Sequence, residues 1–120
     1  MNSLSDLVGA EVDTVSFVRD YVELRMDYSV LRLLVDPTGV VDGQSWSLTP
    51  SDGAEPLRRY IGRWVSGVEY VEDEHIALTI EDGASLGISL RPEDGIGPEA
   101  AHFVPAHADG TLNVAGMLVY

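Results

Sequence analysis

The sequence has no cysteine and no lysine, and it has no long apolar run. Without cysteine the chain forms no disulfide, has no catalytic thiol and offers no thiolate to a zinc site. No apolar stretch approaches the roughly 18 residues of a membrane-spanning helix. The first residues also lack the basic and apolar pattern of a secretion signal. Together these absences favour a soluble cytoplasmic protein.

Positive charge is scarce. The 120 residues carry 20 Asp and Glu against 7 basic residues, all of them arginine, so the net charge is −13. Such a surface repels phosphate backbones and anionic lipids, which excludes nucleic acids and membranes as partners. The lack of lysine, with only two asparagines, indicates a GC-rich bacterial genome, and a halophilic origin is the alternative. The acidic residues are spread along the chain, so the charge belongs to a folded surface and not to a tail.

The length suits one domain, 1–120, and the chain aligns with itself inside it. Gly9 and Asp20 fall on Gly62 and Asp73, with matched apolar positions around them. The match predicts two repeated units, at about 3–35 and 52–91, related by a pseudo-twofold axis, with a C-terminal extension over 92–120. The alternative is chance, because alternating valine and leucine align easily with themselves.

Each unit is expected to open with a short helix and to continue with about three antiparallel strands. Ser3 and Asp6 have the spacing of a helix cap and its reciprocal carboxylate. In the strands that follow, apolar and polar residues alternate with a period of two, which is typical of a sheet with one wet face. Asp82 and Gly83 predict a hairpin turn. The expected fold class is therefore α+β, mostly antiparallel β, with two helix-plus-strand units.

The inward-facing positions of these strands predict the core. The predicted set includes Leu24, Leu78 and Leu86, and also Phe17 and Tyr70 near the ends of the first strands. The segment before each first strand adds Val8 and Ile61 to the same set.

No motif for catalysis, cofactor binding or metal binding is found in the sequence. There is no nucleophile elbow and no phosphate-binding glycine loop. His75, His102 and His107 are not spaced to share one face, so a surface position is the better interpretation of each. Arg58, Arg59 and Arg63 lie close to Trp64 and suggest either a small anion pocket or cations that complement a helix C-terminus and pair with nearby acids. No cofactor, no metal site and no catalytic residue is predicted.

Five residues are candidates for binding a partner. Glu72, Asp73 and Glu74 form the densest acidic run and are expected at a hairpin tip, and Asp20 is the equivalent position of the first unit. The alternatives are a solvated tip and, for the aspartates, a local turn-forming role. Trp46 lies in a loop-like stretch and is either an exposed binding anchor or a residue folded over the open end of the sheet.

A set of glycines, acidic turn residues and apolar strand positions runs through most of the chain. Its members are Gly9, Val12, Val15, Phe17–Val18, Asp20–Val22, Leu24, Ile61–Gly62, Asp82–Gly83, Leu86, Ile88–Leu90 and Gly97–Ala100. In these residues the chain resembles one family of small bacterial proteins of unknown function that is common in actinobacteria. The resemblance implies a single compact domain and carries over no activity and no catalytic residue. A looser, compositional likeness links the small, acidic, cysteine-free chain to the immunity proteins of bacterial toxin systems.

Three classes of function follow from the sequence. The first is a soluble acidic protein that neutralises or docks to a basic protein partner, because charge complementarity speeds such association. The second is a self-associating structural module, for which a homodimer is the simplest form. The third is a small-ligand binder or enzyme with a pocket between the two units. The net charge and the lack of reaction motifs favour the first class.

Overall fold

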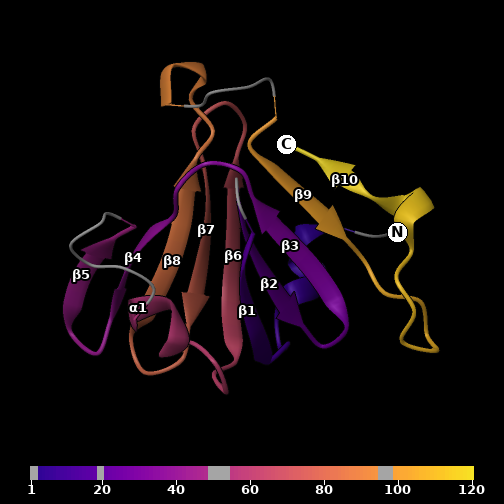
Figure 1. The fold of residues 1–120 in the computed structure, drawn as a ribbon, viewed down its shortest axis with the longest axis horizontal. Helices are drawn as coiled ribbons and strands as arrows, with labels where there is room; N and C mark the ends of the chain where they lie inside the picture. Colours follow the sequence, from indigo (N-terminus) through magenta and orange to yellow (C-terminus); the bar gives the residue numbers. More distant parts are fainter. Residues whose placement is uncertain (1–2, 19–20, 49–54, 95–98) are drawn as a thin grey trace.

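A computed structural model describes residues 3–18, 21–48, 55–94 and 99–120. The chain forms two five-stranded antiparallel sheets, shown in Figure 1. The first sheet has the strand order β1-β2-β3-β9-β10, and the second has the order β5-β4-β8-β7-β6. The segment between β3 and β4 carries the chain from one sheet to the other.

The strands are short and the helical segments are shorter still. The first sheet contains β1 (Val12–Val18), β2 (Tyr21–Met26), β3 (Ser29–Leu33), β9 (Ala101–Val104) and β10 (Leu118–Val119). The second contains β4 (Thr38–Val41), β5 (Gln44–Ser47), β6 (Val65–Val71), β7 (His75–Ile80) and β8 (Ala84–Ser89). The helical segments are η1 (Leu4–Leu7), α1 (Glu55–Arg58), η2 (Pro92–Asp94) and η3 (Val114–Gly116).

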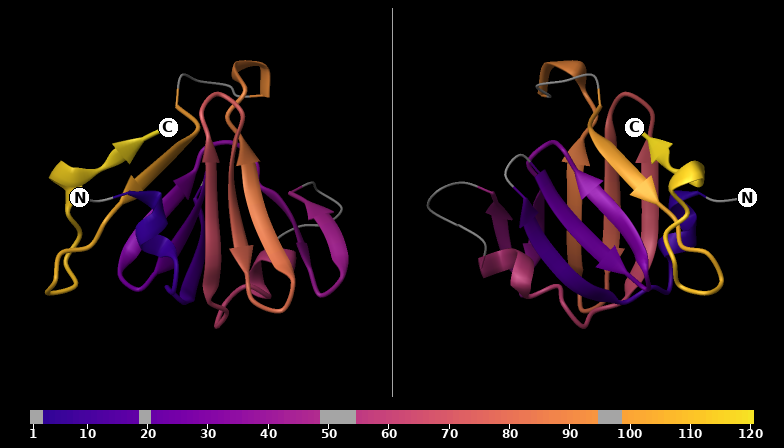
Figure 2. Two further views of the ribbon diagram at one scale, coloured as in Figure 1. Left: turned by 180° about the vertical axis from the view of Figure 1, so that it is seen from behind. Right: turned by 45° about the vertical axis from the view of Figure 1, so that its right-hand side comes forward.

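One hydrophobic core lies between the two sheets. Every second residue of β2, β7 and β8 is buried, so the alternation in the sequence does mark the inward face. Leu24, Leu78 and Leu86 are among the buried residues. The right-hand view of Figure 2 shows the first sheet in front of the second, with the N- and C-terminal segments on the same side of the molecule.

The hairpin turns use residues with positive φ. Asp82 and Gly83 have φ values of +63° and +74°, which confirms the predicted turn between β7 and β8. Asp42 and Gly43 make the same kind of turn between β4 and β5, with φ values of +53° and +79°. Aspartate tolerates this left-handed region better than most residues with a Cβ atom, and glycine enters it freely.

A short backbone seam joins the two sheets where β1 and β6 begin. There the edge strand of each sheet meets the edge strand of the other through a bridge between Glu11 and Trp64. Beyond the seam each of these strands pairs only within its own sheet. The seam hydrogen bonds run from Gly9 N to Val65 O (2.7 Å), from Val12 N to Arg63 O (2.9 Å), from Gly62 N to Val12 O (2.7 Å) and from Val65 N to Ala10 O (2.8 Å).

A polar node sits inside the core of the second sheet. Tyr60, which is 1% exposed, donates its hydroxyl to the Ser85 carbonyl oxygen at 2.5 Å and accepts from Trp46 Nε1 at 2.8 Å. The two aromatic rings also meet edge to face, with centroids 6.0 Å apart. Gly39 of β4 makes room for this node, because a Cβ atom there would overlap the Ser85 carbonyl oxygen and lie 2.6 Å from the Tyr60 hydroxyl.

The expected α+β class with two repeated units is wrong. Of the described residues, 52% are in strand and 13% in helical turns, and no pair of repeated helix-plus-strand units is evident. The segment at the start of the first expected unit is a single 3-10 turn, and its counterpart is one four-residue α-helix. The neighbours differ too, since β3 pairs with β9 whereas β8 pairs with β4. The self-alignment had matched a period-two pattern that any antiparallel meander carries.

Four residues that were predicted in the core are about half exposed. Val8, Phe17, Ile61 and Tyr70 are between 46% and 50% exposed. Phe17 and Tyr70 point to the inner side, but they lie near the far ends of β1 and β6, the edge strands. An edge strand has a neighbour on one side only, so the ends of these two strands are only partly covered.

Replacing Gly39 by alanine is expected to destabilise the protein by about 2–3 kcal/mol, because the added methyl group has no space beside the Tyr60 hydroxyl. Gly67→Ala is the matched control, since a Cβ atom there meets Thr79 at 3.5 Å, an ordinary contact. Urea unfolding of both variants measures the difference. Equal free energies of unfolding would contradict the close approach at Gly39.

Removing the Tyr60 hydroxyl is expected to cost about 1–3 kcal/mol in Tyr60→Phe, because the buried Trp46 N–H then loses its acceptor. Tyr28→Phe is the control, since Tyr28 is 64% exposed, and its effect should stay within about 0.5 kcal/mol. Denaturant unfolding followed by tryptophan fluorescence gives both values. A Tyr60→Phe variant as stable as the control would show that the hydrogen bonds of the Tyr60 hydroxyl do not stabilise the core.

Candidate functional site

The predicted partner-binding residues do not gather in one place. Glu72, Asp73 and Glu74 form the tip between β6 and β7, as expected from the sequence. Asp20 lies outside the described residues. Trp46 is 7% exposed and packs on Tyr60 in the core, so its indole offers little surface to a partner.

The acidic tip is held in a defined conformation. Asp73 has a φ of +61°, and the Glu74 N–H donates to the Val71 carbonyl at 3.0 Å to close the turn. The Leu90 N–H donates to the Glu74 carbonyl at 2.9 Å, so the residues that follow β8 lie beside the tip. The position of the tip is therefore fixed by backbone hydrogen bonds from two strands.

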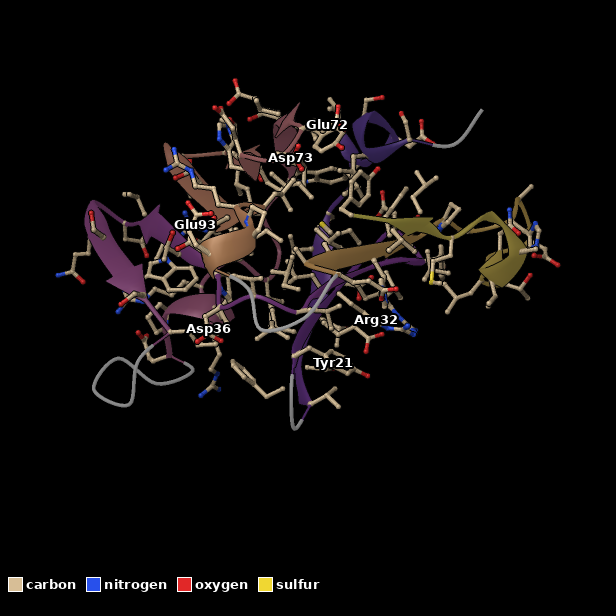
Figure 3. All side chains as sticks on the ribbon, turned by 90° about the horizontal axis from the view of Figure 1, so that it is seen from above. Tyr21, Arg32, Asp36, Glu72, Asp73 and Glu93 are labelled. Atoms are coloured by element: carbon tan, nitrogen blue, oxygen red, sulfur yellow. The ribbon has the colours of Figure 1, made fainter. Side chains whose placement is uncertain are left out.

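A cleft of about 340 Å³ opens at this end of the molecule, where strands from both sheets end. Figure 3 looks down on this end and shows Glu72 and Asp73 of the β6–β7 tip, Glu93 of η2 and Asp36, which follows β3. The cleft combines apolar, aromatic and charged side chains from five segments of the chain. Its lining residues are Val35, Tyr70, Glu72, Asp73, Leu90, Arg91, Pro92, Ala100, Val119 and Tyr120.

Two tyrosines form the aromatic part of the cleft. The rings of Tyr70 and Tyr120 meet edge to face, with centroids 5.0 Å apart and planes at 75°. Tyr120 is fixed by its backbone, which accepts from Ala100 N at 2.6 Å and donates to Ala101 O at 2.9 Å. Burial raises the pKa of the Tyr120 hydroxyl, and the neighbouring Tyr70 adds to that effect. The Tyr120 ring therefore presents a neutral hydroxyl at neutral pH.

The charged groups of the cleft have no ion-pair partner among the described residues. The salt bridges of that part of the chain involve neither Glu72, Asp73 nor Arg91. The charged side chains that line the cleft are thus those of two acidic residues and one arginine. Unpaired carboxylates at a solvent-accessible cleft are free to accept hydrogen bonds from a ligand.

Sequence reasoning missed the aromatic half of this site. Tyr70 was expected in the core, and neither Tyr120 nor Arg91 was singled out. Tyr120 reaches Tyr70 only because β10 pairs with β9, which in turn pairs with β3. No local pattern in the sequence signals that pairing.

A second polar cluster, the Asp42 clamp, binds two arginines at the β4–β5 turn. Asp42, at the β4–β5 turn, binds Arg63 at 2.7 Å and Arg59 at 3.4 Å, and Arg59 also binds Glu55 at 2.9 Å. Of the two interpretations of these arginines, the structure supports pairing with nearby acids. The hydrogen bond from Arg63 is the main reason that the pKa of Asp42 is lowered, and the charges of both arginines add to it.

Two of the three histidines, His75 and His102, each have one carboxylate neighbour. Nε2 of His75 lies 2.5 Å from Glu69, and Nε2 of His102 lies 2.5 Å from Glu99. Among the described residues, no group of three or more His, Cys, Asp or Glu side chains is placed to hold a metal ion. The described helices are also all too short and too polar to cross a membrane.

Comparisons of the chain with protein-family models, with curated proteins and with solved structures found no match. Functional inference therefore rests on the geometry and the charge of the cleft.

The Asp42 clamp predicts a specific dependence of stability on pH. A carboxyl whose pKa is lowered in the folded state stabilises the fold above its unfolded pKa, and this contribution is lost as the pH falls through the lower folded value. Asp42→Asn, which suits the left-handed turn equally well, should therefore be less stable than the unmodified protein at neutral pH. The two stabilities should converge below the ordinary value of 3.8. Urea unfolding from pH 7 to pH 2.5 checks this, and a constant difference over the whole range would contradict it.

Proposed function

We propose that this protein is a soluble acidic binding protein of the cytoplasm that docks to a basic protein partner through its cleft end, in the manner of an immunity protein. The observation that carries the proposal is the pair of unpaired carboxylates, Glu72 and Asp73, at the rim of a 340 Å³ cleft. Both project from a turn, so a partner can reach them without disturbing the sheets. The lack of cysteine suits a reducing compartment.

The net charge supports the same class of partner. With −13 over 120 residues, the long-range field attracts a basic surface and orients it during approach. At the cleft end, Glu93 of η2 and Asp36 add to the two carboxylates of the rim (Figure 3). Electrostatic attraction of this kind mainly raises the association rate, and it weakens as salt screens the charges.

A second candidate function is supported by the position of the cleft. Strands of both sheets border it, and its volume lies at the lower end of the range of small-molecule sites, about 300–1,000 Å³. A small cationic molecule would use the same tyrosines and carboxylates as a protein partner. The two functions differ in the size of the ligand that the purified protein retains.

The test of the proposed function is capture from a native lysate, identification of the captured protein, and reconstitution with that protein in pure form. We expect the association rate constant to fall about tenfold between low salt and about 0.15 M salt. The neutralised variant Glu72→Gln, Asp73→Asn, Glu74→Gln should lose a similar factor at low salt. Asparagine at position 73 retains the left-handed turn, so the fold is preserved.

The matched control neutralises three acids at the seam end of the molecule, in the variant Glu11→Gln, Asp13→Asn, Asp27→Asn. Both triple variants change the net charge by the same amount, and Asp27 also sits in a turn with positive φ. Equal effects of the two variants would show that only net charge matters, and would contradict docking at the cleft end. A homodimer in light scattering with no basic partner would favour self-association instead.

A further inference from the structure

The lining of the cleft is specific enough to name the group that it receives. Its lining includes the aliphatic side chains of Val35, Leu90, Ala100 and Val119. Its rim carries the unpaired carboxylates of Glu72 and Asp73. A ligand that matches both parts has an aliphatic stem and a positively charged end, which is the structure of a long basic side chain.

The tyrosine pair favours arginine over lysine. Tyr70 is 47% exposed, so its ring remains accessible although its neighbour Tyr120 contacts it edge to face. A guanidinium group is planar and weakly hydrated, and it stacks on an aromatic face while its N–H groups reach carboxylates alongside. An ammonium group is compact and strongly hydrated, so it gains less from such a ring.

We propose that the cleft binds the side chain of a single arginine, presented by a basic protein segment. The proposal rests on the proposed function and deepens it, since it names the anchor that the partner inserts. The guanidinium group lies beside the carboxylates of Glu72 and Asp73 and the ring of Tyr70, and the methylene groups contact aliphatic side chains of the lining.

The charge of Arg91 predicts the direction in which the affinity changes when that charge is removed. Arg91 lines the same cleft, and its positive charge repels an incoming cation. Removing its charge by Arg91→Gln should therefore strengthen the binding of an arginine side chain. A cleft built for an anion or for a zwitterion would instead use Arg91 to hold the negative group, and the same variant would weaken binding.

The experiment measures binding of three capped peptides to the full chain by NMR titration. The probes are acetyl-Gly-Arg-Gly-amide, its lysine analogue and its citrulline analogue, which is neutral and nearly isosteric with arginine. We expect the arginine peptide to shift the signals of Tyr70 and Tyr120, and the citrulline peptide to bind about tenfold more weakly because it lacks the charge. The lysine peptide should bind less tightly than the arginine peptide.

Variants then assign the binding to the cleft. Glu72→Gln with Asp73→Asn should weaken the arginine peptide about tenfold, Tyr70→Leu about threefold, and Arg91→Gln should strengthen it about twofold. Glu11→Gln with Asp13→Asn, at the seam end, is the control and should leave the affinity unchanged. Equal affinity for arginine and citrulline peptides, or weaker binding in Arg91→Gln, would overturn the proposal.

Failure of this proposal is distinguishable from failure of the proposed function. A basic partner that depends on Glu72 and Asp73, without any binding of the arginine peptide, would leave docking intact and remove the arginine anchor. Binding of the arginine peptide without a basic partner would retain the site and remove the protein-docking function.

Discussion

The arrangement of the two sheets depends on the backbone seam between the starts of β1 and β6. Four hydrogen bonds there join the edge strand of one sheet to the edge strand of the other. The two strands then pair only within their own sheets, so the molecule is closed at the seam end and less covered at the other. Tyr70, near the far end of β6, is half-exposed for this reason, and the cleft with its acidic tip opens at that end. The seam thereby accounts for the location of the candidate site.

The parts of the fold that could be predicted are those encoded locally. A period of two marked the inward faces of β2, β7 and β8, and Asp82 with Gly83 marked a turn, because both depend only on neighbouring residues. The fold class was wrong because capping signals at Ser3 and Asp6 do not determine helix length, and only single turns form. Strand β9 was missed as well. It is a short segment between Pro98 and Pro105, and it becomes a strand by pairing with β3 and β10.

The candidate site was half predictable for the same reason. A dense acidic run between two alternating strands indicates an exposed hairpin tip, and Glu72 to Glu74 lie there. The tyrosines of the cleft come from positions 50 residues apart in the sequence, and only the completed first sheet brings them into contact. The sequence left the position of Trp46 open, because its neighbouring serines favour the surface and its large apolar ring favours burial. The Tyr60 hydroxyl supplies the acceptor that allows its indole to be buried.

The pairing of two arginines with Asp42 inside the molecule affects how copies of the protein interact in solution. Arg59 and Arg63 are two of only seven cations, and both point to carboxylates of their own chain. Few positive groups remain to form bridges between molecules, so two copies approaching in dilute buffer meet predominantly like charge. The osmotic second virial coefficient is then positive at low ionic strength and declines as salt is added. Exposed edge-strand residues such as Phe17 can contact another copy only after salt has screened that repulsion.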